Sequence, residues 1–151
     1  MKYSTKIIVE IPLQEFIRKF DNINNLRHWQ RGLISTEHIS GVPGEYASKM
    51  KLKYKSGKRI IELIETVIHR NLPHEFHSTY DIKGLHNIQE NYFKENENGH
   101  TIWISKNEFV PLNFTMKLMT KLMPNVFKKQ SKQYMNDFKN FAEKNISVTN
   151  S

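Results

Sequence analysis

From residue 33 onward, the spacing of hydrophobic residues changes once, near Pro111, and that change limits the folds that the chain can adopt. From about residue 33 to residue 109, alternating polar and apolar residues predict a series of antiparallel strands. Turn signals separate them, at GVPGE, KSGK, RNLPHE, KGLH and NENGH. After Pro111 the period is 3.6, which predicts a helix to about Asn145 that Pro124 kinks or divides.

The first 32 residues predict one strand followed by two short helices. Residues 3–11 alternate and are rich in β-branched types, and Pro12 then opens the helical segment PLQEFIRKF. A second helical piece lies around NINNLRHWQRGL and ends at Gly32. An antiparallel sheet needs a cover on one face, and only the C-terminal helix is long enough to supply it. We therefore expect an α+β fold in which a curved sheet of about seven strands wraps around that helix.

Composition excludes several classes of protein. A length of 151 residues fits one domain, which we expect to span residues 1–145 with a loose tail at 146–151. The hydrophobic content of 38% excludes a disordered chain, and the absence of cysteine excludes disulfides and thiol chemistry. Because no stretch is long and apolar enough for a signal peptide or a membrane span, we expect a cytoplasmic protein.

The most basic segment carries six cations between Lys49 and Arg59. A Ser56-Gly57 hairpin loop would place Lys51 opposite Glu62 and Met50 opposite Leu63. The lysines then share one face, whereas Tyr54 and Glu65 share the other face with apolar residues. We interpret the lysine face as solvated, because nucleic-acid binding would need aromatic stacking residues on that same face. Phosphate binding remains an alternative, but no nucleic-acid partner is expected.

A second hairpin, around NENGH, suggests further inward residues. A two-residue turn at Asn98-Gly99 would pair Tyr92 with Ser105 and Glu90 with Asn107. The face that then includes Trp103 has more aromatic side chains, so it is the expected inner face. A loop of odd length would reverse one strand relative to the other.

The predicted C-terminal helix begins with several methionines. Met116, Met119 and Met123 lie beside leucines, and methionine fills irregular space or lines adaptable binding surfaces. Ordinary core packing is the alternative interpretation of this stripe.

Motifs for metal, nucleotide and hydrolase chemistry are missing from the sequence. The segment HEFH does not have the spacing of a zinc protease, and His74 and His77 would point to opposite faces of a strand. No nucleophile elbow, P-loop or dinucleotide-binding glycine motif occurs. We therefore expect no metal and no cofactor.

Several landmarks along the chain resemble those of one superfamily. They are Pro12 at the end of the first strand, Asp21, Trp29 and Gly32 in the helical segment, PGE at 43–45, ETV at 65–67, Pro73, Pro111 and Pro124. From Lys2 to about Lys144 the chain resembles the START-like, or Bet v 1-like, superfamily of polyketide cyclase/dehydrase-like (SRPBCC-type) proteins. This resemblance implies a helix-grip fold with a cavity between the sheet and the C-terminal helix. It also implies an apolar ligand such as a lipid, a sterol or a polyketide.

The leading hypothesis for function is the binding of a small, mostly apolar molecule in that cavity. The candidate lining residues are Tyr54, Glu65, Tyr80, Glu90, Tyr92, Trp103, Asn107, Met116, Met119, Met123 and Phe127. The alternatives are a cyclase or dehydratase that uses cavity Glu, Tyr or His side chains as acid and base, and a protein-interaction domain.

Overall fold

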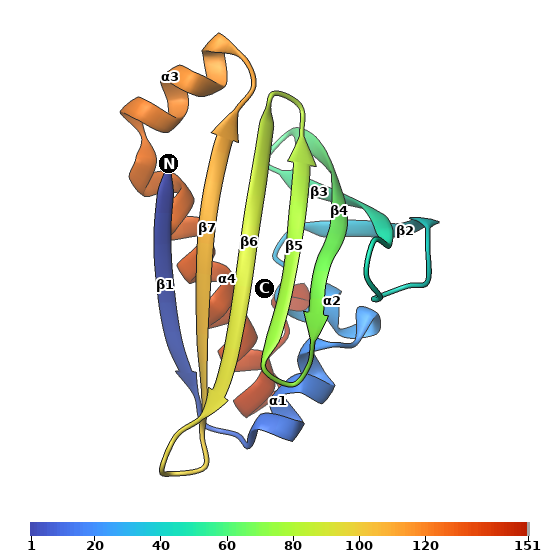
Figure 1. Ribbon diagram of the computed structural model, residues 1–151, viewed down its shortest axis with the longest axis vertical. Helices are drawn as coiled ribbons and strands as arrows, with labels where there is room; N and C mark the ends of the chain where they lie inside the picture. Colours follow the sequence, from blue (N-terminus) through green and yellow to red (C-terminus); the bar gives the residue numbers. More distant parts are fainter. Residues whose placement is uncertain (151) are drawn as a thin grey trace.

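Seven antiparallel strands form a single curved sheet in the order β1-β7-β6-β5-β4-β3-β2 (Figure 1). The computed structural model describes residues 1–150, with Asn150 described only through its backbone. The strands are β1 (Lys2–Val9), β2 (Leu33–Ser40), β3 (Lys49–Ser56), β4 (Arg59–Asn71), β5 (Glu75–Ile82), β6 (Leu85–Glu95) and β7 (Thr101–Pro111). The predicted α+β fold with about seven strands is therefore confirmed.

The helices lie where the sequence predicts them. Between β1 and β2 the chain forms α1 (Leu13–Phe20), the 3-10 turn η1 (Ile23–Asn25) and α2 (Leu26–Trp29). The C-terminal helical region is divided at Pro124 into α3 (Phe114–Leu122) and α4 (Pro124–Lys144). Pro124 occupies the first turn of α4, where its missing N–H costs no hydrogen bond.

Helix α4 covers one face of the sheet, here called the inner face, and packs mainly along β1 (Figure 1). α1 and α2 lie at one end of this face, and α3 projects beyond the sheet at the other end. An aromatic cluster fills the α1 end, where Phe16 meets Phe138 with ring centroids 4.8 Å apart and Phe20 meets Phe93 at 5.1 Å. The main hydrophobic core therefore occupies only part of the space between sheet and helix.

The predicted register of the first hairpin is wrong by two residues. The structure pairs Ser56 with Arg59 and Met50 with Glu65, so the turn residues are Gly57 and Lys58. Because side chains alternate with a period of two, this even shift leaves Tyr54 and Glu65 on the predicted inner face.

The predicted register of the second hairpin is wrong by one residue. β6 pairs Asn91 with Ser105 and Gln89 with Asn107. Asn96 N donates to His100 O at 2.8 Å, which closes a three-residue loop that contains Gly99 at φ +74°. This odd shift turns the whole of β6 over. Asn87, Gln89, Asn91 and Phe93 face inward.

The C-terminal segment of the chain lies beside α2. In the expected loose tail at 146–151, of which residue 151 lies outside the described residues, the chain forms the 3-10 turn η2 (Val148–Asn150), and Ser147 Oγ lies 2.8 Å from His28 Nδ1. Within residues 1–150, no helix has the length and apolar character needed to cross a bilayer.

Candidate functional site

A belt of amide side chains crosses the inner face next to the aromatic core. Trp103 Nε1 donates to Asn91 Oδ1 at 2.9 Å, and Asn91 Nδ2 donates to Gln89 Oε1 at 3.2 Å. Asn107 Oδ1 accepts from both Gln89 and Asn87, each at 3.2 Å. The belt exists because β6 and β7 place these residues side by side on one face. Its internal hydrogen bonds offset the cost of burying the amides.

At the β3–β5 end of the inner face lies the glutamate–tyrosine cluster, which consists of Tyr54, Glu65, Tyr80 and Tyr134. Glu65 on β4 is directly opposite Tyr80 on β5, and the two side chains are hydrogen-bonded. Tyr54 approaches from β3 and donates to Gln30 Oε1 at 3.1 Å, while Tyr134 approaches from α4. All four side chains are half-buried rather than fully packed. This end of the inner face therefore presents polar atoms on an apolar background.

Burial controls the protonation of this cluster. It raises the pKa of Glu65, and the hydrogen bond from Tyr80 only partly opposes that shift. The pKa values of Tyr54 and Tyr80 are raised first by burial and further by the Glu65 carboxyl. Within residues 1–150, Glu65 forms no ion pair that would compensate its charge. Burial therefore shifts the equilibrium of Glu65 toward the neutral acid, the form that can donate a hydrogen bond.

The predicted site residues fall into three groups. Tyr54, Glu65, Tyr80, Asn107 and the half-buried Phe127 lie on or against the inner face. Trp103 also points inward, but it is only 4% exposed and belongs to the aromatic core.

The third group lies away from the inner face. Glu90 and Tyr92 are on the outer face, where the Tyr92 hydroxyl donates a hydrogen bond to Glu90. This hydrogen bond is the main reason that the pKa of Tyr92 is raised to about 12. Met119 and Met123 belong to this group because both are exposed, whereas Met116 is half-buried beside Gly84 in the β5–β6 turn. Gln89, Asn91 and Asn87 were missed, because the assumed two-residue turn placed them outside.

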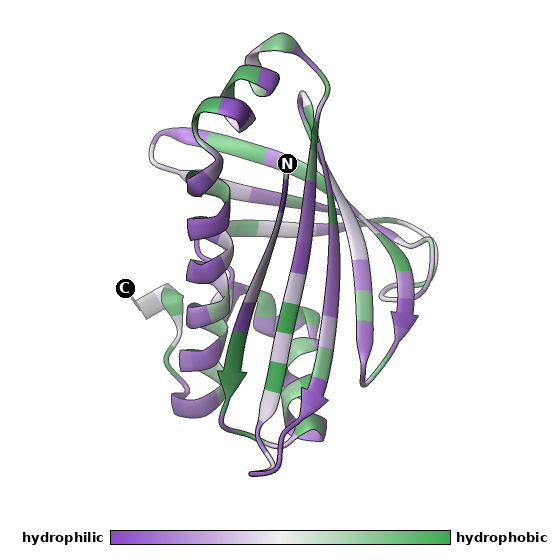
Figure 2. Cartoon of the chain, turned by 60° about the vertical axis from the view of Figure 1, so that its left-hand side comes forward, coloured by the Kyte–Doolittle hydropathy of each residue, from purple (hydrophilic) through white to green (hydrophobic). Residues whose placement is uncertain are grey.

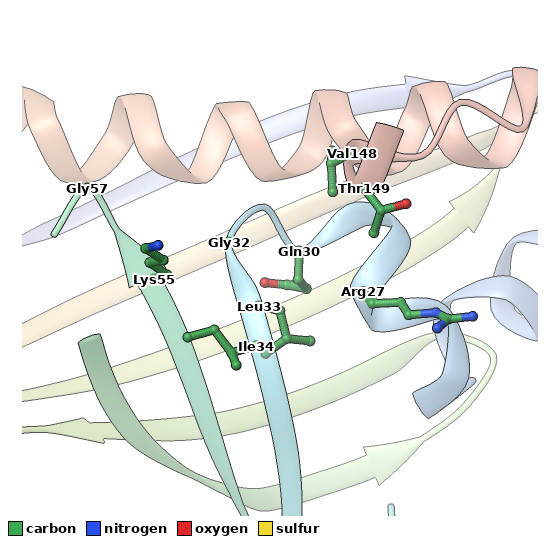
Figure 3. A pocket seen from close by; sticks show the side chains of 9 residues that line it. All are labelled: Arg27, Gln30, Gly32, Leu33, Ile34, Lys55, Gly57, Val148 and Thr149. Carbon is green, nitrogen blue, oxygen red and sulfur yellow. The ribbon is translucent and has the colours of Figure 1, made fainter. Parts of the chain in front are cut away.

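A surface depression of about 520 Å³ lies at the edge of the sheet between α2, β2, β3 and η2 (Figure 3). Arg27 and Lys55 line it together with Gln30, whose side chain also accepts the hydrogen bond of Tyr54. Gln30 therefore links this depression to the glutamate–tyrosine cluster.

Three potential metal ligands, His69, Glu75 and His77, meet on the outer face with their ligand atoms within 4.8 Å of one another. His69 Nε2 lies 2.8 Å from Glu75 Oε2. The His77 Nδ1, however, accepts the backbone N–H of Asn91 at 3.1 Å. The neutral His77 ring therefore has its proton on Nε2 and offers no lone pair there to a cation. This hydrogen bond opposes metal binding in the observed geometry.

Comparison with solved structures identifies the architecture. The Zhui aromatase/cyclase from Streptomyces sp. R1128 superposes with a TM-score of 0.79 at 10% identity, over 95% of this chain and 93% of that one. Ara h 8.0201 gives a TM-score of 0.72 at 10% identity, over 94% and 97% of the two chains. This is the Bet v 1-like helix-grip fold. The fold that the sequence resemblance implied is thus confirmed.

A conserved protein from Geobacillus kaustophilus shares the Bet v 1-like fold, with a TM-score of 0.75 at 12% identity over 94% of this chain and 95% of that one. No family model matches the sequence, and no curated protein matches it. The likeness therefore lies in the backbone arrangement, and the chemistry of the site has to be argued from this chain's own residues.

Proposed function

We propose that this protein binds a small, mostly apolar molecule with one hydrogen-bonding end, in the space between the inner face and α4. The observation that carries this proposal is Glu65, a desolvated carboxyl on the inner face that has no cationic partner within residues 1–150. A buried acid of this kind is costly unless it is neutral or has a partner. A ligand carbonyl or hydroxyl would supply the partner.

The surroundings of Glu65 support the same proposal. Tyr54 and Tyr80 add phenol oxygens that can accept a hydrogen bond, and Leu63 and Ile61 on the same face of β4 add apolar surface. The side chains of Tyr54, Ile61, Leu63 and Tyr80 all keep accessible surface on the inner face. The amide belt lies on the same inner face, and Phe127 packs against Phe109 of β7 with ring centroids 4.8 Å apart. We propose that Asn107 and Phe127 contribute through these surroundings, and Met116 from the α3 end.

The test uses Nile red, an uncharged apolar dye with a carbonyl acceptor, titrated by fluorescence from acidic to alkaline pH. We expect the wild type to bind best while Glu65 is protonated and to lose about tenfold in affinity as Glu65 ionises. Glu65→Gln keeps a neutral donor, so its affinity should not depend on pH. Glu65→Leu, which has no donor, should bind weakly at every pH.

Glu62→Gln is the matched control, because Glu62 lies on the outer face of the same strand in a 3.3 Å ion pair with Lys53. It should reproduce the wild-type pH profile. The proposal would be contradicted if the wild type showed no saturable dye binding. It would also be contradicted if the affinity of Glu65→Gln for the dye changed with pH in the same way as that of the wild type.

Acid–base catalysis is a second candidate, favoured by the raised pKa of Glu65 and its hydrogen bond with Tyr80. The same fold supports catalysis in the aromatase/cyclase named above. Deuterium uptake at the activated methylene of an apolar 1,3-diketone, followed by NMR, would detect a general base. Uptake that the wild type accelerates and Glu65→Gln does not would assign Glu65 that role.

A further inference from the structure

Helix α3 is amphipathic, but its apolar side points away from the protein. On the side that packs toward the sheet, Thr120 is 8% exposed and Met116 is half-buried. On the opposite side, Phe114 is 78% exposed and Leu122 is 68% exposed, with Leu118 between them at helical spacing. A helix of a globular protein normally buries its apolar stripe. Here the stripe has no covering element among the described residues.

The orientation of α3 is held by specific contacts. Asn113 caps the helix, because its Oδ1 accepts the N–H of Met116 at 2.8 Å. Leu112 N donates to Gly84 O at 2.8 Å, so the start of α3 is attached to the turn between β5 and β6. Gly84 adopts φ +78° and leaves no room for a Cβ against Asn113. These contacts set which side of α3 faces outward.

The apolar stripe continues beyond α3 on both sides. Leu112 precedes the helix, Met119 borders the stripe, and Met123 and Val126 follow it, all of them exposed. Figures 1 and 2 show α3 projecting past the end of the sheet, with hydrophobic bands along it. The patch is therefore a protruding ridge. Contiguous exposed apolar surface of this kind marks an interaction site.

The charges beside this ridge have a single sign. Between Glu108 and Asp137 the sequence contains no acidic residue. The same segment holds five lysines, at positions 117, 121, 128, 129 and 132. None of the five forms an ion pair with another described residue. Lys117 and Lys121 flank the stripe on α3 itself, where long side chains can keep their ammonium groups at a polar boundary.

We infer that α3 and the start of α4 form a docking surface for an anionic lipid membrane. A protruding helix that offers apolar side chains at its tip and lysines on its flank suits a fluid interface: the apolar groups enter the acyl boundary and the lysines meet lipid phosphates. The inference goes beyond the proposed ligand site and does not depend on it. Docking would also place the α3 end of the inner face, next to the β5–β6 turn, against the bilayer.

The test is co-sedimentation of the full chain with vesicles. Vesicles of phosphatidylcholine mixed with phosphatidylglycerol should retain the protein, and pure phosphatidylcholine should retain much less. Phe114→Ser with Leu118→Ser should reduce retention at least tenfold, since both side chains are exposed and their loss should leave the fold intact. Lys117→Gln with Lys121→Gln should lose about fivefold per lysine, and added salt should abolish that difference.

The control variants lie elsewhere on the surface. Ile60→Ser removes an exposed apolar side chain of β4, and Lys49→Gln with Lys55→Gln removes two exposed lysines of β3. Neither control should change retention. Equal retention by both kinds of vesicle, or retention that the Phe114 and Leu118 changes leave intact, would overturn the inference. Self-association through this ridge without vesicle binding would also overturn it, and would assign the ridge to a second copy of the chain.

Discussion

Glu65 is the residue at which burial and charge conflict most directly. Its carboxyl is desolvated on the inner face, and its pKa is therefore higher in the folded protein than in the unfolded chain. The folded state binds this proton more tightly than the unfolded state does. Its contribution to stability is therefore complete below the ordinary pKa of 4.5 and is lost as the pH rises through the folded pKa.

Removing this titration should be visible in unfolding experiments. As the pH rises, the wild type should lose stability relative to Glu65→Gln, because only the wild type releases this proton. The total change in the difference between their free energies of unfolding should be about 1.4 kcal/mol for each unit by which the pKa of Glu65 in the folded protein exceeds its ordinary pKa. Urea unfolding at a series of pH values measures this difference. Wild-type and variant curves that stay parallel across the series would show that Glu65 is solvated.

At the scale of elements, the two long hairpins show how the length of a turn determines which side chains of a strand face inward. In the first hairpin the expected pairing is displaced by two residues, and Tyr54 and Glu65 stay on the inner face. In the second it is displaced by one, so Glu90 and Tyr92 lie outside and the amide belt takes their place. The segment NENGH is compatible with both a two-residue and a three-residue loop, and the choice depends on pairing along the whole strands.

The attachment of α3 can be tested at the same scale. Gly84→Ala would suffer both a positive φ and a clash with Asn113, whereas Gly57→Ala has φ +63° and no neighbour within 4 Å. Both should lose about 1 kcal/mol from backbone strain. Only Gly84→Ala should also speed amide hydrogen exchange in α3 while leaving α4 unchanged. Equal exchange in the two variants would mean that α3 is held by other contacts.

For the whole molecule, one ion pair joins α4 to the connection between α2 and β2. Arg31 Nε and Nη2 donate to the two carboxylate oxygens of Asp137 at 3.1 and 3.0 Å, and Gln133 adds a bond at 3.1 Å. The Asp137 side chain is 5% exposed, whereas that of Arg31 is 52% exposed. The pair fixes α4 beside the early helices.

Breaking this pair leaves a buried carboxylate without a cation. Arg31→Gln should therefore lower the free energy of unfolding by about 2 kcal/mol, less than for a fully enclosed pair because Arg31 is partly solvated. Lys53→Gln, which breaks an exposed pair with Glu62, should cost less than about 0.5 kcal/mol. Similar losses in a denaturant titration of the two variants would show that the Arg31 pair makes no special contribution.

The sequence by itself determined the order of elements and the α+β class, while the helix-grip architecture was implied by the family resemblance. Those depend on local period and on residues such as Pro12 and Pro124, which act on the chain beside them. The tertiary structure decided which β6 side chains face inward and that Trp103 belongs to the core. It also decided that the apolar stripe of α3 faces outward. Each of these depends on pairing or packing between segments distant in sequence, and period alone does not specify such partners.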